Sequence, residues 1–269
     1  MSEPHLANTL HDVIDAPVLE VHSLSKSFGG VQALKDVTFT LRRGEVLGIV
    51  GDNGAGKSTL IKCLSGVLAP DTGTVFVDGE QVNIDSPARA RQLGIETVYQ
   101  GLALVETLNV SENLFLNREE TTRIPILRRL GWLDKKRMNQ ESRKVLETLR
   151  IRIPSVRRDV IHLSGGQRQS IAIGRAIAWG RHIVFMDEPA AALGVEQAQH
   201  VLELIATLSS RDVAIILISH NMRHVMEVCT RAMVLLHGRK VAEVPIAEVT
   251  ERDLVDLITG AKAGEDVEP

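Results

Sequence analysis

The chain has 269 residues with a formal net charge of −3, and 44% of its residues are hydrophobic. That length and apolar content are enough for one large domain or two modest ones, which excludes a disordered chain. The slight acidic excess gives no reason to expect nucleic acid as a partner. Its two cysteines, Cys63 and Cys229, lack metal-ligand spacing, and no stretch is long enough to span a bilayer. We therefore expect a soluble chain from a reducing compartment, with both cysteines as core thiols.

The first ninety residues combine short strands with turns. Residues 1–17 lack periodicity and are expected to form a loose leader, followed by a strand at 18–21. Alternating apolar and polar residues predict a strand at 37–41, and residues 74–77 before the Asp78-Gly79 turn predict a further antiparallel hairpin. This part therefore mixes β-hairpins with one strand–loop–helix unit.

That strand–loop–helix unit contains a phosphate loop. Its residues are Gly51, Asp52, Asn53, Gly54, Ala55, Gly56, Lys57, Ser58 and Thr59. The loop follows an apolar run at 46–50, which predicts a buried parallel strand, and precedes a helical apolar pattern. Glycines let backbone N–H groups turn toward a polyphosphate, and the N-terminus of the helix faces the same anion. Lys57 would reach the β- and γ-phosphates and Ser58 would bind Mg²⁺. A glycine-rich turn that binds nothing is the alternative, but the placement of strand, lysine and serine favours binding of a nucleoside triphosphate.

Residues from about 102 onward favour helices and are dense in arginine and lysine. We expect a helical insertion at about 102–180. Its basic residues include Arg123, Arg128, Arg129, Lys135, Lys136, Arg137, Arg143, Lys144, Arg157 and Arg158. Two interpretations remain open: solvated helix faces interleaved with acidic residues, or a surface that docks to a membrane or a partner.

A second glycine-rich element is Leu163-Ser164-Gly165-Gly166-Gln167, before a helical run at 170–179. Ser164 can cap that helix, and the two glycines expose backbone N–H groups where an anion can bind. Two phosphate-binding elements in one chain suggest a composite site, with the second element supplied by another copy. An ordinary helix cap is the alternative.

The C-terminal part alternates strands and helices. Apolar runs at 183–186 and 214–218 predict central strands, with a helix at 195–208 between them. Strands are also expected at 233–236 and 240–244. A final helix is expected between Thr250, which forms a cap-like pair with Asp253, and Gly260, and residues 262–269 should fray.

Asp187 and Glu188 follow the first of these apolar runs, at the strand end where parallel sheets bind ligands. The aspartate can hold Mg²⁺, and the glutamate can act as general base on the attacking water. A surface acidic pair is the alternative interpretation. The predicted fold class is α/β: a P-loop NTPase core with a parallel sheet, an N-terminal antiparallel β subdomain and an inserted α-helical subdomain, in a single domain over 18–261.

These motifs together resemble the ATP-binding cassette ATPases of membrane transporters, over about residues 18–236. The resemblance implies ATP and Mg²⁺ as cofactors, Phe28 stacked on the adenine, and Gln100 sensing Mg²⁺ or the attacking water. It implies that His220 contacts the γ-phosphate. It also implies a homodimer closed head to tail on two ATP molecules, each Ser164 facing the other subunit's phosphate loop.

One position departs from the family pattern: Gly194 stands where an aspartate is usual, which puts the coupling between the two ATP sites in doubt.

The stretches at 94–100, 191–194 and 218–222 resemble importers of simple sugars such as ribose, xylose and fructose, and the single cassette resembles the fructose type. That resemblance implies a peripheral subunit on the cytoplasmic face of the membrane, with permease subunits and an extracytoplasmic sugar-binding protein as partners. The alternatives are a soluble cassette ATPase acting on nucleic acid or ribosomes, and a regulatory cassette that binds ATP without hydrolysing it.

Overall fold

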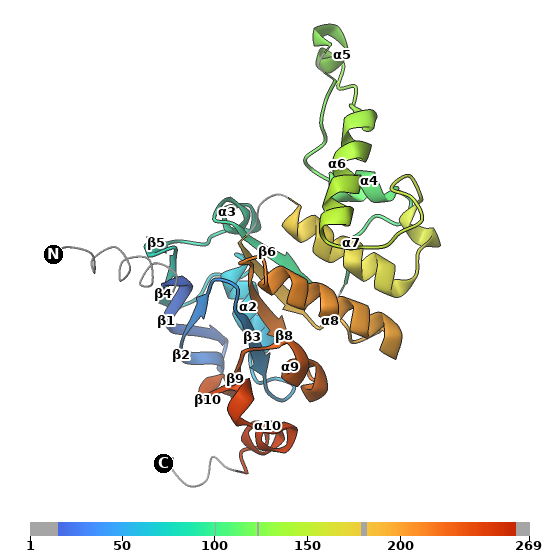
Figure 1. The fold of residues 1–269 in the computed structure, drawn as a ribbon. Coiled ribbons are helices and arrows are strands. Elements are labelled where there is room, and N and C mark those ends of the chain that lie inside the picture. The colour runs from blue at the N-terminus through green and yellow to red at the C-terminus, as the bar shows by residue number, and fades with distance from the viewer. Residues whose placement is uncertain (1–15, 100, 123, 179–181, 262–269) are drawn as a thin grey trace, which may run out of the picture. The chain divides into compact units, whose positions relative to one another are not determined.

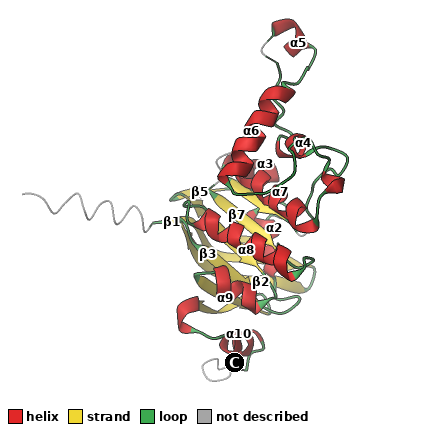
Figure 2. Ribbon diagram, turned by 45° about the vertical axis from the view of Figure 1, so that its right-hand side comes forward, coloured by secondary structure: helices red, strands yellow, loops and turns green. Residues whose placement is uncertain are grey.

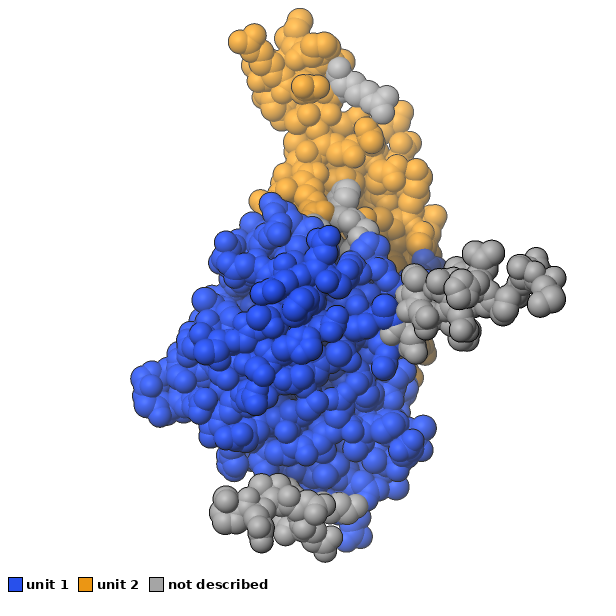
Figure 3. Space-filling view, turned by 90° about the vertical axis from the view of Figure 1, so that its left-hand side faces the viewer, with its two compact units in different colours: residues 1–97, 181–188, 208–269 blue, residues 98–180, 189–207 orange. Residues whose placement is uncertain are grey.

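A computed structural model describes residues 16–99, 101–122, 124–178 and 182–261 (Figure 1). The chain divides into two compact units (Figure 3): unit 1 comprises residues 1–97, 181–188 and 208–269, and unit 2 comprises 98–180 and 189–207. Most of the expected leader and the tail at 262–269 lie outside the described residues.

Unit 1 contains an antiparallel sheet in the strand order β2-β1-β4-β5. Its strands are β1 (Pro17–Phe28), β2 (Val31–Arg42), β4 (Thr72–Val77) and β5 (Glu80–Val82). The strands predicted at 18–21 and 37–41 lie within β1 and β2. The hairpin predicted around Asp78-Gly79 is confirmed, because Val77 pairs with Glu80 across that turn.

The second sheet has the order β10-β9-β3-β8-β7-β6. Its strands are β3 (Val46–Val50), β6 (Ile95–Val98), β7 (Ile183–Asp187), β8 (Ala214–Ile218), β9 (Arg231–Leu236) and β10 (Arg239–Pro245). β3 pairs in parallel with β8 and β9, β7 pairs in parallel with β8, and β10 pairs antiparallel with β9. Every residue of β3 and β8 is buried, as continuous apolar strands of a parallel layer require. The predicted α/β class with a parallel sheet is confirmed.

The helices of unit 1 are α2 (Lys57–Leu64), α3 (Pro87–Gln92), α9 (Met222–Val228) and α10 (Glu251–Ile258), with a 3₁₀ turn at Ile246–Glu248. α2 packs in one core with residues of both sheets, and this core includes Cys63. Thr250 and Asp253 form a reciprocal capping box at the start of α10, as the sequence predicts. The sequence analysis missed α3, α9 and β6, which are short.

Unit 2 consists of helices joined by loops (Figure 2). They are α4 (Val110–Leu114), α5 (Pro125–Arg129), α6 (Lys135–Thr148), the 3₁₀ turn Val160–His162, α7 (Gly165–Ile177) and residues 195–207 of α8 (Val195–Ser209). A separate apolar core joins α4, α6 and α7 through side chains such as Leu114, Leu146 and Ile171. Within the described ranges, none of the helices has the length and apolar character needed to cross a bilayer.

Candidate functional site

The phosphate loop joins the end of β3 to the start of α2 in unit 1. Gly51 and Gly56 have φ angles of +153° and +106°. A Cβ on Gly51 would lie 2.2 Å from the carbonyl oxygen of Leu235, and one on Gly56 would lie 2.6 Å from that of Ala33. Glycine is therefore required at both positions by backbone conformation and by the close approach of distant strands.

The phosphate loop is also held by the turn between β9 and β10. The N–H of Gly238 donates to the carbonyl of Ala55 at 3.0 Å, and the N–H of Lys35 in β2 donates to the carbonyl of Gly238 at 2.7 Å. These bonds fix the loop backbone without using its side chains. The turn between β9 and β10 thus holds the phosphate loop at Ala55.

Lys57 is the first residue of α2, and its ammonium group bends over the loop. Its Nζ donates to the carbonyl oxygens of Gly51 at 2.7 Å and Asp52 at 2.9 Å. Burial lowers the pKa of Lys57, and the carboxylates of Glu188, Asp52 and Asp187 oppose that shift. The lysine is therefore a half-buried donor that a phosphate oxygen can engage in place of the loop carbonyls.

Asp187 ends β7, and the nearby Ser58 hydroxyl favours the ionised form of its carboxyl. Burial raises the pKa of Asp187, and the neighbouring Glu188 carboxylate raises it further, against Lys57 and Lys62. A hydroxyl and a carboxylate are hard oxygen donors, which fit Mg²⁺. Among the described residues, no group of three or more His, Cys, Asp or Glu side chains is placed to hold a metal ion.

Glu188 and His220 are in contact, although 32 residues separate them. Oε1 of Glu188 accepts a 2.9 Å bond from the backbone N–H of His220 and lies 2.7 Å from its Nδ1. A carboxylate only accepts, so Nδ1 carries the proton and donates. Glu188 has a φ of +53°, unusual for a residue with a side chain, and its N–H donates to the carbonyl of Ile218 at 3.0 Å. These bonds hold the backbone in this conformation and fix the carboxylate in place.

His220 itself is positioned by a helix that the sequence analysis missed. Asn221 caps α9, and its Oδ1 accepts from the N–H groups of Arg223 and His224. The imidazole of His220 stays mostly exposed at the start of this helix. An asparagine directly before a helical run is a cap signal that could have revealed α9.

Ser164 forms a capping box at the start of α7 in unit 2. Its Oγ accepts from the N–H of Gln167 at 3.2 Å, and Oε1 of Gln167 accepts from the N–H of Ser164 at 3.1 Å. The two glycines between them have a packing role, and Gly166 is buried. A Cβ on Gly166 would lie 2.9 Å from Cβ of Gln197 in α8, and one on Gly165 would lie 3.2 Å from the Leu193 side chain. The α7 N-terminus is thus held against the segment that contains Gly194.

Phe28, predicted to stack on a base, ends β1 and is 47% exposed. The Nζ of Lys26 lies 5.7 Å from its ring centroid. Asp71 holds this end of β1, because it accepts from Lys26 Nζ and from the N–H of Ser27, each at 2.7 Å. Asp71 is a positioning residue that no sequence pattern indicated. Gln100 lies outside the described residues.

Gly194 precedes α8, and its carbonyl accepts the first helical bond, from the N–H of Ala198 at 2.9 Å. It therefore occupies the N-cap position. Nothing lies within 4 Å of where its Cβ would stand. The local structure does not require glycine here.

The comparisons with known proteins agree with this geometry. Residues 34–191 match the model of the ABC transporter family. The chain is 42% identical over 247 residues to a xylose/arabinose import ATP-binding protein of Sulfolobus acidocaldarius, covering 92% of this chain and 96% of that protein. It is 43% identical over 254 residues to a fructose import ATP-binding protein of Rhizobium meliloti, covering 91% and 95%. A ribose import ATP-binding protein of Caldanaerobacter subterraneus is 39% identical, and the match covers 93% of this chain but 49% of that longer protein.

Solved structures show the same fold. A nucleotide-free ATP-binding cassette from an ABC transporter superposes with a TM-score of 0.78 at 27% identity, over 93% of this chain and 98% of that one. A cassette of an ABC transporter in its ADP conformation gives a TM-score of 0.76 at 26% identity, with the same coverage.

Proposed function

This chain belongs to the ABC transporter family and binds and hydrolyses ATP, and we propose that it does so as the energising subunit of a simple-sugar importer. The specific import function is supported by relatives named for xylose and arabinose, fructose, and ribose. Most of the side chains that we assign to the chemistry belong to unit 1.

The triphosphate is held by the phosphate loop. Its N–H groups and the α2 N-terminus face the β- and γ-phosphates, and Lys57 exchanges its bonds to Gly51 and Asp52 for bonds to phosphate oxygens. Because the lysine is half-buried, each such bond forms in a medium that screens charge less than water does. Phe28, exposed at the end of β1, stacks on the adenine.

Ser58 Oγ and the Asp187 carboxylate are the residues that would hold Mg²⁺, and we assign Gln100 to the same ion or to the attacking water. When bound, Mg²⁺ neutralises charge on the phosphate oxygens. A cation beside Asp187 also offsets the unfavourable burial of two adjacent carboxylates, which raises the pKa of Asp187 in the chain alone.

Glu188 is the general base. Its carboxylate is fixed beside His220 and close enough to Lys57 to influence the lysine's pKa, so base and phosphate-binding cation share one end of the sheet. This arrangement is the single observation that carries the ATPase proposal. His220 donates to Glu188 through Nδ1 and can turn its exposed ring toward the γ-phosphate, which leaves Oε1 of Glu188 to accept a proton from water.

The second phosphate-binding element comes from another copy of the chain. Ser164, Gly165, Gly166 and Gln167 begin α7, where N–H groups are available to the γ-phosphate held by the partner's phosphate loop. Two copies thus close on two ATP molecules, on the cytoplasmic face of the membrane. Permease subunits carry the sugar, delivered by an extracytoplasmic binding protein.

The test of the ATPase assignment is Glu188→Gln. It removes the base but keeps the shape, so ATP binding should persist while hydrolysis falls by about 10²- to 10⁴-fold. The variant should also accumulate as an ATP-bound dimer in size-exclusion chromatography. Glu80→Gln, which alters an exposed carboxylate in β5, is the matched control and should hydrolyse ATP like the unaltered protein. Hydrolysis unchanged by Glu188→Gln would refute the assignment.

A further inference from the structure

Two groups of basic residues in unit 2 differ in their partners. Several are paired with acids of unit 2 itself: Lys135 with Glu112 at 3.0 Å, Arg137 with Glu120 at 2.8 Å, Lys144 with Glu141 at 2.8 Å and Arg168 with Glu106 at 2.9 Å. For these, the interpretation as solvated helix faces is sufficient. The second group lies in residues 121–133, which we call the tip.

The tip differs in composition from the rest of this slightly acidic chain. Its sequence is Thr-Thr-Arg-Ile-Pro-Ile-Leu-Arg-Arg-Leu-Gly-Trp-Leu, which contains three arginines, six large apolar residues and no aspartate or glutamate. Arg128 and Arg129 end α5 and are exposed, and no ion pair is found for either within the described residues. These two guanidinium groups are available to an external anion.

The described residues at the two ends of the tip pair as a hairpin. Thr121 bridges Leu133, the N–H of Thr122 donates to the carbonyl of Trp132 at 2.8 Å, and that of Asp134 donates to Glu120 at 2.7 Å. Within unit 2, α5 lies beyond the first turn of α6, away from α4 and α7 (Figures 1 and 2). The backbone bonds at the base of the tip therefore hold α5 in this position beyond α6.

The apolar side chains of the tip face solvent. Ile124, Ile126, Leu130 and Trp132 are 55–76% exposed. Four large apolar residues exposed within nine positions form a patch that water does not favour, and such patches mark interaction sites. Exposed apolar residues alone do not identify the partner. Their combination with arginines, and the presence of a tryptophan among them, narrows the classes of partner that fit.

We propose that the tip lies on an anionic lipid surface. Tryptophan favours the boundary between headgroups and acyl chains, isoleucine and leucine enter the outer acyl region, and arginine reaches back to lipid phosphates. The absence of acidic residues from the tip sequence removes repulsion from the negative surface. This proposal rests on the proposed function only in that a transporter subunit works beside a bilayer; the binding itself is a property of unit 2.

The test uses the purified full chain with vesicles of phosphatidylglycerol and phosphatidylcholine, and with vesicles of phosphatidylcholine alone. Co-sedimentation should be at least about tenfold stronger with the anionic vesicles. Two double variants, Ile126→Ser with Trp132→Ser and Arg128→Glu with Arg129→Glu, should each lose that binding. In a Trp179→Phe background, which leaves Trp132 as the sole tryptophan, emission should shift to the blue and be quenched by brominated lipids.

Two matched controls address charge and apolar content. Arg211→Glu with Arg239→Glu makes the same charge change in unit 1, and Val31→Ser removes an apolar side chain as exposed as those of the tip. Both should bind anionic vesicles like the unaltered chain. ATP hydrolysis by the tip variants should be unchanged, which separates this proposal from the ATPase assignment.

Absent binding to anionic vesicles would overturn the proposal, as would binding that the tip variants leave intact. Tip variants that keep vesicle binding but lose a co-purifying membrane protein would show that the tip docks to protein instead.

Discussion

The local structure requires glycine at position 51 but not at position 194. Gly51 is demanded by its positive φ and by the Leu235 carbonyl, 2.2 Å from where a Cβ would stand. Gly194 caps α8 in open space. The fold therefore does not explain why this residue is glycine.

We expect Gly194→Asp to fold normally. An aspartate at an N-cap is a few tenths of a kcal/mol better than glycine and restricts the unfolded chain, so Tm should stay unchanged or rise by up to about 3 °C. Gly51→Ala is the contrasting variant and should lower Tm, because a methyl group meets backbone that cannot move away. Differential scanning calorimetry of both variants checks this, and a clear fall in Tm for Gly194→Asp would contradict it.

Residue types at the site were predictable, but their contacts were not. The phosphate loop and the Asp187-Glu188 pair follow from local patterns, because a strand, a turn and a helix lie consecutively in the sequence. The bond from His220 to Glu188 spans 32 residues and depends on the parallel pairing of β7 with β8, which no local pattern fixes. The roles of Phe28, Gln100, Ser164 and His220 came from family resemblance and remain predictions.

Among the elements, β3 and β8 match their predicted ranges, because short continuous apolar runs rich in β-branched residues favour a buried strand. β1 runs seven residues beyond the prediction at 18–21, through the mostly polar stretch that ends at Phe28. That stretch pairs with β2 and β4 with several shifts of register. Its strand conformation therefore depends on pairing with distant strands and not on alternating apolar and polar residues. The helix α3, which has one buried residue, gives almost no periodic signal.

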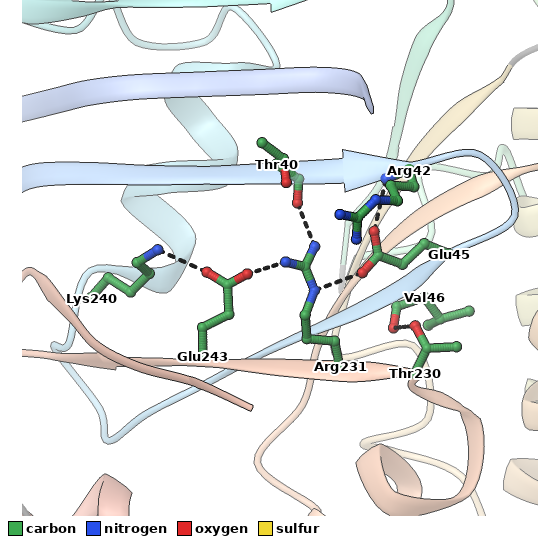
Figure 4. Close-up of polar contacts among 8 residues, drawn as sticks. All are labelled: Thr40, Arg42, Glu45, Val46, Thr230, Arg231, Lys240 and Glu243. Carbon is green, nitrogen blue, oxygen red and sulfur yellow. Dashed lines mark hydrogen bonds and ion pairs between the residues drawn. The ribbon is translucent and has the colours of Figure 1, made fainter. Parts of the chain in front are cut away.

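The two sheets of unit 1 are linked by a half-buried ionic network around Arg231 in β9 (Figure 4). Its guanidinium bonds Glu45 at 2.8 Å, the Thr40 carbonyl at 2.7 Å, and Glu243, which also pairs with Lys240. The second oxygen of Glu45 accepts from the N–H of Arg42 at 2.7 Å. One cation thus ties β2, β9 and β10 to the start of β3.

Replacing that cation should be costly. Arg231→Met leaves Glu45 largely buried without its partner, which should reduce the free energy of unfolding by about 3 kcal/mol. Arg43→Met breaks the exposed pair with Asp78 and should cost less than about 1 kcal/mol. Urea unfolding measures both, and equal losses for the two variants would show that the network contributes no more than a surface pair.

For the whole molecule, composition indicated a globular chain, and the slight acidic excess gave no reason to expect nucleic acid as a partner. The α/β fold was predicted from the alternation of strand and helix patterns, and it is confirmed. A net charge averaged over the chain concealed the basic, apolar tip, which became distinct once the ion pairs within unit 2 were visible. The phosphate loop lies in unit 1 and Ser164 lies in unit 2. The composite site between two copies remains a proposal, because a single chain does not test it.

The central claim is that this ATPase works on a permease that imports a simple sugar. It is tested most directly by purifying the tagged protein from mild-detergent membranes of its source cells and identifying what accompanies it. We predict a multi-span permease together with an extracytoplasmic sugar-binding protein. Recovery of ribosomes, of DNA, or of the cassette alone would contradict the account.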